Sequence, residues 1–389
     1  MSEDWKVVAE KLAADLRADA VERERIGAEP FNEVDRLRKS GLLTLLVPSE
    51  RGGWGAGWSA VNEVTRIVAA ADASVGHLLG YHFLQLWRTR LFDRPDELER
   101  LERATTTENW FWAGVSNPLD AALQLTPVPG GLRVDGTKTF ATGTSVADRL
   151  VVSGVRTDTE AKVTFTIDAR ADGISYPDGW DNLGQRLTAS GAITFNEAYI
   201  SDGEVLGATD DEAPGAVLRS LAALGFQLML TQVAVGIAEG ALAEAADYTR
   251  TRSRGWTPSG VAAAVEDPYA LAGYGEWAAR TRAARALADE AAAQLWSAFE
   301  AGVDLGAEQR GEAAVAIASA KIVASRLATE VASGVFEFTG ARSTSNAVGL
   351  DRFWRNARTL TLHDPVSHKA REVGDHVLTG AYPTPSGYS

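Results

Sequence analysis

The residues that say most about the fold run FTGARSTSNAVGLDRFWRNARTLTLHDP, from Phe338 to Pro365. Near its start this stretch places Arg342, Ser343 and Thr344 just after a glycine, and near its end it places a lone histidine, His363. A buried phosphate needs charge-assisted donors, and a forked guanidinium beside two hydroxyls supplies them well. In a chain with a net charge of −14, this cluster indicates where a phosphate-bearing ligand would bind.

The composition is that of a well-packed globular protein with an acidic surface. Of 389 residues, 45% are hydrophobic and 23% are charged, and 52 acidic residues outnumber 38 basic ones. An acidic chain repels the phosphates of nucleic acids and anionic membrane surfaces, and no long basic run offsets that charge. We therefore expect neither a nucleic acid nor a membrane as a partner.

Two absences in the sequence limit where the chain acts and by what chemistry. The N-terminus is charged and helix-periodic, and no stretch comes near 18 uninterrupted apolar residues, so we expect a cytoplasmic protein without a membrane span. The chain has no cysteine, which excludes disulfides, thiolate metal sites and iron–sulfur clusters. Any redox chemistry must therefore belong to a bound organic cofactor.

The periodicity of the sequence divides the chain into three regions. Residues 1–108 carry apolar side chains at helical spacing, and residues 109–212 contain short β-branched segments bounded by turns. The segments are GLRVDGTKTF, RLVVSGVRT, KVTFTID and GAITFNEAYI, and the first of them alternates about an expected turn at Asp135-Gly136. In residues 213–389 the helical period returns, and it predicts three long helices and a shorter one at 215–251, 267–302, 307–339 and 365–378.

Helices, then a small β region, then a long-helix bundle is the order found in the acyl-CoA dehydrogenase superfamily, and three segments resemble that superfamily. They are LRKSGLLTLLVPSERGGWGAGW, LRVDGTKTFATGTSVADRLVV and YTRTRSRGW. Within the superfamily the chain most resembles the flavin-dependent monooxygenase branch, which includes dibenzothiophene monooxygenases and amine N-hydroxylases. That resemblance rests on WDNLGQRLTASG, TGARSTSNAVGLDRFWRNART and LHDPVSHKAREVGDHVLTG.

The resemblance implies an α+β fold of the acyl-CoA dehydrogenase type. It has an N-terminal helical domain, a central β-barrel-like domain and a C-terminal four-helix bundle, at 1–108, 109–212 and 213–389. In this superfamily the bundles associate as dimers of dimers with the cofactor sites beside a subunit boundary, so the resemblance also implies a homotetramer.

The resemblance implies a two-component enzyme. Reduced FMN and O2 form a C4a-hydroperoxyflavin, which oxygenates a small apolar sulfur compound or, as a lesser possibility, an amine. No GxGxxG motif follows a strand pattern, so the chain has no nicotinamide-binding unit of its own. We therefore expect the reduced FMN to come from a separate flavin reductase.

Three residues match the positions where this branch places catalytic groups. Thr142 and His363 match a hydroxyl and a histidine beside the reactive edge of the flavin, and His82 matches a second histidine on the substrate side. Histidine suits this role because its ordinary pKa near 6.5 lets it give and take a proton around neutrality. Each of the two histidines also has a plainer interpretation as a structural residue.

The cofactor-binding residues follow from the same resemblance. Arg342, Ser343, Thr344 and Arg254 are expected at the phosphate, and Arg252 could share that task. The ring is expected between aromatic side chains with a few polar contacts, which are supplied by Phe140, Trp180 and Asn117. No metal site is expected, because His77 and His82 are five residues apart, as are His363 and His368, and this spacing separates two side chains by about 140° on a helix.

One departure from the dehydrogenases keeps a second function open. Asp364 stands where many of them have a catalytic glutamate, one methylene shorter and followed by Pro365. Misplacing a catalytic base by about 1 Å costs on the order of 100-fold in rate, so dehydrogenation is disfavoured but not excluded. The alternatives are an FAD-dependent acyl-CoA dehydrogenase with Asp364 as base, and a catalytically silent protein that keeps the fold for assembly.

Overall fold

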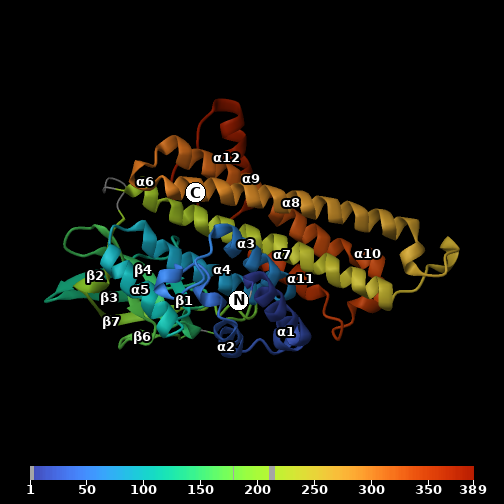
Figure 1. Ribbon diagram of the computed structural model, residues 1–389, viewed down its shortest axis with the longest axis horizontal. Coiled ribbons are helices and arrows are strands. Elements are labelled where there is room, and N and C mark those ends of the chain that lie inside the picture. Colours follow the sequence, from blue (N-terminus) through green and yellow to red (C-terminus); the bar gives the residue numbers. More distant parts are fainter. Residues whose placement is uncertain (1–3, 178, 210–214) are drawn as a thin grey trace.

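A computed structural model describes residues 4–177, 179–209 and 215–389. Figure 1 shows long helices running side by side along one flank, with a curled sheet and the N-terminal helices packed beneath them. This is the arrangement of an acyl-CoA dehydrogenase-like fold, which confirms the predicted α+β class.

The N-terminal region is helical, as its periodicity predicts. Asp4 caps the first helix by accepting a hydrogen bond from the Lys6 amide, and Gly27 ends it in the left-handed conformation that glycine adopts most readily. Asp72 caps the fourth helix in the same way through the amide of Val75. The helices are α1 (Trp5–Ile26), α2 (Phe31–Ser40), α3 (Trp58–Ala71), α4 (Ala73–Arg88) and α5 (Pro95–Thr107).

The strands form one mixed sheet with the order β6-β7-β3-β2-β4-β5-β8, and β1 pairs in parallel with β4. Their bounds are β1 (Trp112–Val115), β2 (Leu123–Val128), β3 (Gly131–Lys138), β4 (Arg149–Arg156), β5 (Lys162–Asp168), β6 (Ile174–Ser175), β7 (Ile193–Ser201) and β8 (Val205–Ala208). Sequence analysis identified the segments of β3, β4, β5 and β7 but not the other four.

The expected turn at Asp135-Gly136 is wrong. β3 runs straight through this dipeptide, and the register against β7 shifts between Val134 and Gly136. Gly136 has a φ of 127°, a value that side chains disfavour. The extra residue of the bulge lies on β7, where Asn196 and Glu197 face Asp135 alone and Glu197 has a φ of 52°. A bulge and a tight turn both use an Asp-Gly pair, and only the partner strand decides between them.

The C-terminal region is a helical bundle built on α7, α8 and α9 (Figure 1). By length and composition α6 and α7 together could cross a membrane, but 83% of the most apolar window is buried inside the fold, as in the core helix of a globular protein. The helices are α6 (Ala216–Arg219), α7 (Leu221–Thr251), α8 (Pro268–Glu300), α9 (Ala307–Gly334), α10 (Phe336–Thr339), α11 (Asp351–Leu360) and α12 (Val366–Thr379).

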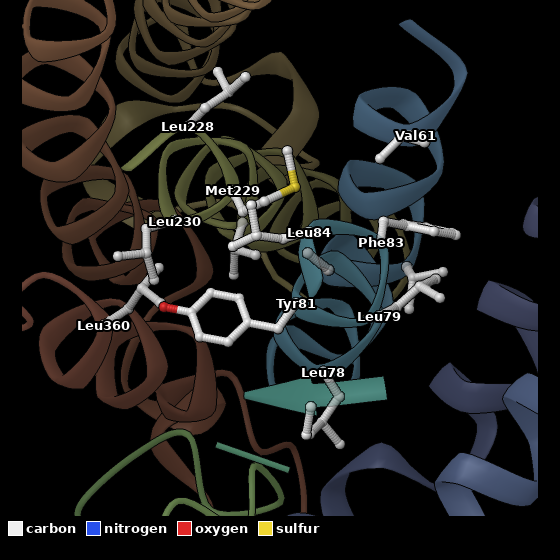
Figure 2. Close-up of a cluster of buried hydrophobic side chains, with 14 of the residues drawn as sticks. Val61, Leu78, Leu79, Tyr81, Phe83, Leu84, Leu228, Met229, Leu230 and Leu360 are labelled. Atoms are coloured by element: carbon white, nitrogen blue, oxygen red, sulfur yellow. The ribbon is translucent and has the colours of Figure 1, made fainter. Parts of the chain in front are cut away.

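The hydrophobic core continues across all three regions. α4 is buried along its whole length, between α3, α7 and the sheet. Figure 2 shows the ring of Tyr81 projecting from α4 toward Leu230 of α7 and Leu360 of α11. The first predicted domain boundary falls between Thr107 and Trp112, where helix gives way to strand. The second, at residues 212 and 213, lies outside the described residues.

Candidate active site

One large cavity lies where the helical regions meet the sheet. It encloses about 1030 Å³ between α4, residues 180–190, the first part of α7, and α11, and residues 385–388 of the C-terminal tail close one side. Ligand pockets usually measure roughly 300–1,000 Å³. The cavity therefore has room for a flat cofactor ring and a small substrate together.

A chain of hydroxyl groups lines one wall of this cavity. Thr142 Oγ1 lies 2.8 Å from Ser190 Oγ, which lies 2.8 Å from Thr188 Oγ1. Thr188 donates its proton to the carbonyl oxygen of Gln185 at 2.8 Å. Since each hydroxyl has one proton, Ser190 then donates to Thr188 and Thr142 donates to Ser190. The Thr142 oxygen is left able to accept a hydrogen bond from a ligand.

The backbone around this wall is strained. Phe140, Gln185 and Ala189 have φ values of 53°, 55° and 45°. Residues other than glycine rarely adopt this left-handed region, and such strain tends to occur at ligand-binding and catalytic sites. The strain holds the loop of residues 180–190 in the shape that lines the cavity.

The predicted aromatic pair lies at the cavity. The ring of Trp180 meets that of Phe140 edge to face, with the centroids 5.9 Å apart, and the Trp180 Nε1 donates to the Gln185 carbonyl at 2.7 Å. Phe140 is 64% exposed although it is a large apolar residue. Asn117 lines the same cavity, and its side-chain amide donates to Thr139 Oγ1 at 3.2 Å.

His77 also lines the cavity, on the buried face of α4. The Gln185 amide nitrogen donates to the Asn356 carbonyl, so its oxygen faces His77 Nδ1, 3.1 Å away, and His77 must donate from that nitrogen. The His77 Nε2 is buried without a hydrogen-bond partner. Burial lowers the pKa of His77 to about 4, so the ring is neutral at pH 7 and offers a free acceptor.

His82 does not lie at the cavity, so its predicted place on the substrate side is incorrect. It is fully buried in the core, where Nε2 lies 2.7 Å from the Leu43 carbonyl and Nδ1 accepts from the Trp112 amide at 3.0 Å. Its ring stacks on that of Phe111. Both nitrogens are thus occupied by the fold, and His77, five residues earlier on the same helix, takes the position at the cavity.

His363 lines the cavity from the loop after α11. Its Nδ1 lies 3.0 Å from Asp364 Oδ1, and the same carboxylate oxygen pairs with Lys321 of α9. The carboxylate therefore orients the imidazole, and no partner is found for the His363 Nε2 among the described residues. Lys321 also donates to the side-chain oxygen of Gln227.

The environment of Asp364 makes it a poor base. Burial by itself would raise the pKa of Asp364, but the hydrogen bond from His363 and the charge of Lys321 hold that pKa well below its ordinary value. A carboxylate with a depressed pKa accepts protons weakly. Asp364 is also absent from the lining of the cavity within the described ranges. These facts argue against its use in removing a proton from a substrate.

The predicted phosphate-binding arginines lie elsewhere. Arg342 and Arg254 are exposed at the far end of the bundle, where the Ser253 hydroxyl donates to the Thr339 carbonyl at 3.3 Å and links their two segments. From Leu230, which lines the cavity, to the end of α7 the helix rises by roughly 30 Å. The structure brings these arginines together but places them away from the cavity of their own chain.

Both predicted hydroxyls beside Arg342 form hydrogen bonds within their own segment. Ser343 is buried, with its hydroxyl 2.7 Å from Thr339 Oγ1, and it donates to the Gly340 carbonyl at 2.7 Å. Thr344 donates to the Ala341 carbonyl at 2.7 Å. Both hydroxyls tie the 3₁₀ turn of Ala341–Thr344 together, so the guanidinium of Arg342 is the exposed donor of this segment.

Sequence reasoning missed His77, Tyr81, Gln185 and Ser190, which all line the cavity. Ser190 lies inside the quoted segment WDNLGQRLTASG, and its hydroxyl could have been noticed there. His77 and Tyr81 are four residues apart and share one helix face, but their spacing does not show which face of the helix meets the cavity. The described residues contain no group of three or more histidine and acidic side chains arranged to hold a metal ion.

The fold and this cavity define a flavoenzyme of the acyl-CoA dehydrogenase type, and residues 228–368 match the family described as "Acyl-CoA dehydrogenase, C-terminal domain". The chain belongs to the flavin-dependent monooxygenase branch of that superfamily. It is 42% identical to a dibenzothiophene monooxygenase of Rhodococcus erythropolis, over 98% of this chain and 95% of that protein. It is 40% identical to a probable FMNH2-dependent monooxygenase, SfnC, of Pseudomonas putida, over 98% and 96%.

Solved structures agree with this assignment. FMN-bound TdsC from Paenibacillus sp. A11-2 superposes with a TM-score of 0.93 at 43% identity, over 99% of this chain and all of that one. Methanesulfinate monooxygenase MsuC from Pseudomonas fluorescens gives a TM-score of 0.93 at 41% identity, over 99% of both chains.

Proposed function

We propose that the protein is the oxygenase of a two-component system and that it transfers one oxygen atom to a sulfur compound. A separate flavin reductase supplies reduced FMN. Reduced FMN provides two electrons and two protons, so that one atom of O2 is reduced to water while the other bonds to the sulfur. The sulfur is oxidised and the flavin leaves as FMN.

The residues at the cavity fit a flavin. The ring is flat and apolar with polar edges, and the cavity offers an aromatic pair, the acceptor oxygen of Thr142, and a size sufficient for both ring and substrate. Phe140 and Trp180 would flank the ring, and Asn117 would bind near its edge. The similarity to FMN-bound TdsC and to an FMNH2-dependent monooxygenase supports FMN over FAD.

We propose that the phosphate is bound by a second copy of the chain. Arg342 and Arg254 project from the tip of the bundle, beside the exposed apolar side chains of Trp256, Tyr269 and Leu271. Exposed apolar groups of this kind mark protein–protein contacts. A neighbouring copy would place its bundle tip over this cavity, as in the homotetramer that the resemblance implies.

The cytoplasmic location of the protein stays a prediction.

The protons are handled by three groups around the cavity. His363, oriented by Asp364, has a free Nε2 and exchanges a proton with the reacting oxygen. His77 offers a neutral acceptor nitrogen on the substrate side, in the role that had been predicted for His82. Thr142 holds a hydrogen bond at the edge of the ring. The apolar walls formed by Tyr81, Phe226 and other side chains exclude water, which would otherwise compete for the oxygen.

The arrangement of His363, Asp364 and Lys321 is the main support for this proposal. The carboxylate of Asp364 orients the imidazole of His363 and is not available to remove a proton from a substrate. The test supplies the protein with FMN, a flavin reductase, isotopically labelled O2 and an organic sulfide. We expect one labelled oxygen in the product. An unlabelled product, or acyl thioester oxidation without O2 consumption, would contradict the proposal.

A further inference from the structure

The inner part of the cavity carries a charge that the proposed chemistry does not use. Among the described residues the cavity lining includes four cationic side chains and no aspartate or glutamate, although the chain has a net charge of −14. The four are Arg88, Lys162, Arg219 and Arg358. Lys162 and Arg358 are exposed and Arg219 is half-buried, so Arg88 is the buried cation among the four.

Arg88 is exceptional among these groups because it is buried without an acidic partner. Of the five arginines that are buried in the described part of the chain, Arg66, Arg149 and Arg352 each pair with a carboxylate. Arg310 has none, but it does not line the cavity. Arg88 is 7% exposed and lines the cavity. A buried, unpaired guanidinium is costly, which suggests that a ligand completes its coordination.

The surroundings of Arg88 hold its guanidinium in place. Nη1 donates to the side-chain oxygen of Gln85 at 2.7 Å, and Cζ lies 5.5 Å from the centroid of the Phe226 ring. The amide nitrogen of Gln85 is itself buried without a partner. Gln85 packs behind Gly114, where a Cβ atom would clash with it. Gln85 does not line the cavity, so it holds Arg88 in place and the guanidinium of Arg88 is the donor that this end of the cavity presents.

An aromatic path connects Arg88 to the histidine at the cavity. The ring of His77 lies 4.4 Å from that of Tyr81, which lies 5.3 Å from that of Phe226. Figure 2 shows the ring of Tyr81 projecting from α4 toward Leu230 of α7. The steps of 5.3 Å and 5.5 Å put the guanidinium of Arg88 no more than about 11 Å from the Tyr81 ring.

We propose that Arg88 binds an anionic group of the substrate, so that the enzyme acts on elongated sulfur compounds with an apolar body and a carboxylate, sulfinate or sulfonate at the end remote from the reacting sulfur. This inference rests on the proposed function. Burial lowers the pKa of Arg88 only to about 10, so the guanidinium is charged at neutral pH. A forked guanidinium matches the paired oxygens of such groups.

The test compares two substrates that differ only in charge, 6-(phenylthio)hexanoate and 6-(phenylthio)hexanamide. Sulfoxide formation is measured with FMN and a flavin reductase, and binding is measured by calorimetry on protein saturated with FMN. The variants are Arg88→Met, which removes the charge but keeps an extended side chain, and Arg88→Lys, which keeps the charge but not the fork. Arg103→Met, on the exposed face of α5, removes the same charge outside the cavity.

Wild-type protein should prefer the hexanoate, with a KM about 10- to 100-fold below that of the hexanamide, as expected for a charge-assisted hydrogen bond. Arg88→Met should abolish this preference mainly through KM, because Arg88 lies away from the reacting sulfur. Arg88→Lys should retain part of the preference, and Arg103→Met should retain all of it.

Several outcomes would overturn the assignment. The assignment fails if wild-type protein binds the two compounds equally, or if Arg88→Met weakens the binding of both compounds equally. It also fails if Arg88→Met weakens FMN binding itself, which would make Arg88 a phosphate ligand. If wild-type protein oxygenates neither compound, the proposed function fails, and the calorimetric difference between the hexanoate and the hexanamide still decides whether Arg88 binds anions.

Discussion

The cavity and the tip of the bundle differ in whether their polar side chains are held by neighbouring side chains or are exposed. At the cavity, His77, His363 and Thr142 are each held by a neighbouring side chain. At the tip, Arg342 and Arg254 are exposed. The cavity is lined by the first part of α7, from Ala222 to Leu230, and the tip lies beyond the other end of that helix, at Thr251.

This difference separates the work of one active site between two surfaces. Groups that move protons must be oriented, which requires a rigid and partly buried setting. Groups that bind the phosphate of an exchangeable cofactor can be exposed in the single chain, because a second chain covers them in the assembly. Each prediction below tests one side of this separation.

The largest effect is expected at His363. Replacing it with glutamine should lower the turnover number for oxygen transfer by about 10²- to 10⁴-fold, the usual contribution of a general acid or base. FMN binding should change little, because the phosphate is bound by the other surface. His368→Gln, on the exposed side of α12, is the matched control. A loss below tenfold would mean that the cavity does not depend on this imidazole.

The next effect concerns stability at the cavity. Lys321→Met should destabilise the fold by about 3–5 kcal/mol, because it leaves the buried carboxylate of Asp364 without its cation. The double variant Lys321→Met/Asp364→Asn should recover part of the lost stability, because the buried side chain at position 364 is then neutral. Guanidinium-induced unfolding at pH 7 measures both changes. If the single variant were as stable as the wild type, the pair would have no structural role.

The two buried histidines of α4 predict a pH dependence. Burial lowers the pKa of both His77 and His82 to about 4. The unfolded chain therefore takes up protons first, and the stability that each neutral ring contributes is complete above pH 6.5 and lost as the pH falls toward 4. Between pH 6.5 and pH 4 the free energy of unfolding falls by about 1.4 kcal/mol per pH unit for each ring. This amounts to roughly 3 kcal/mol for each ring over the whole range.

His82→Gln separates the two contributions. Unfolding measured at pH 7 and pH 5 should show a smaller loss of stability in this variant than in the wild type, by about the contribution of one ring. Activity with a sulfide should persist, because His82 belongs to the core. An unchanged pH dependence of stability would show that the pKa of His82 is the same in the folded and unfolded chains. A large loss of activity would show that His82 belongs to the active site.

The smallest effect is expected at the bundle tip. Arg342→Ala should weaken FMN binding by about 10- to 100-fold, which corresponds to the loss of one charge-assisted contact. Lys11→Ala, on the exposed surface of α1, controls for the change in net charge. Equilibrium titration with FMN, followed by flavin fluorescence, measures the change.

A mixing experiment then tests whether the two surfaces belong to different copies. Arg342→Ala and His363→Gln chains are unfolded, mixed and refolded together, and activity is measured at an FMN concentration that saturates the wild type but leaves Arg342→Ala largely empty and inactive. If the tip of one copy completes the cavity of another, about a quarter of the sites should receive both intact parts and activity should reappear. If both parts came from the same chain, no mixed site would be intact and the mixture would stay inactive.

Much of the candidate site was visible in the sequence because local segments carry it. Thr142, Phe140 and Trp180 lie in segments that resemble a known family, and all three line the cavity. The β-strands were identified less completely, because β1, β6 and β8 have only two to four residues each. β2 does alternate, with Leu123 and Leu125 buried between exposed polar residues, and this signal was missed. The turn assigned to Asp135-Gly136 failed for a different reason, since the same dipeptide serves a bulge when a partner strand continues beside it.

The histidine of α4 could not be chosen from the sequence. His77 and His82 lie on one apolar helix, and their side chains differ by about 140° in direction. Only the packing of α4 against β1 and the loop of residues 180–190 turns His77 toward the cavity and His82 toward Leu43 and Trp112. The function of a neutral ring depends on that direction, and a single sequence does not record it.

The sequence by itself determined the order of the three regions and the places of the long helices, because periodicity is a property of neighbouring residues, and its resemblance to a known family indicated the cofactor. Only the tertiary structure decided which groups meet. Lys321 reaches Asp364 from another helix, and the arginines of the bundle tip lie far from the cavity of their own chain. Such contacts join residues that are distant in the chain, and their energies depend on burial, which arises only when the core forms.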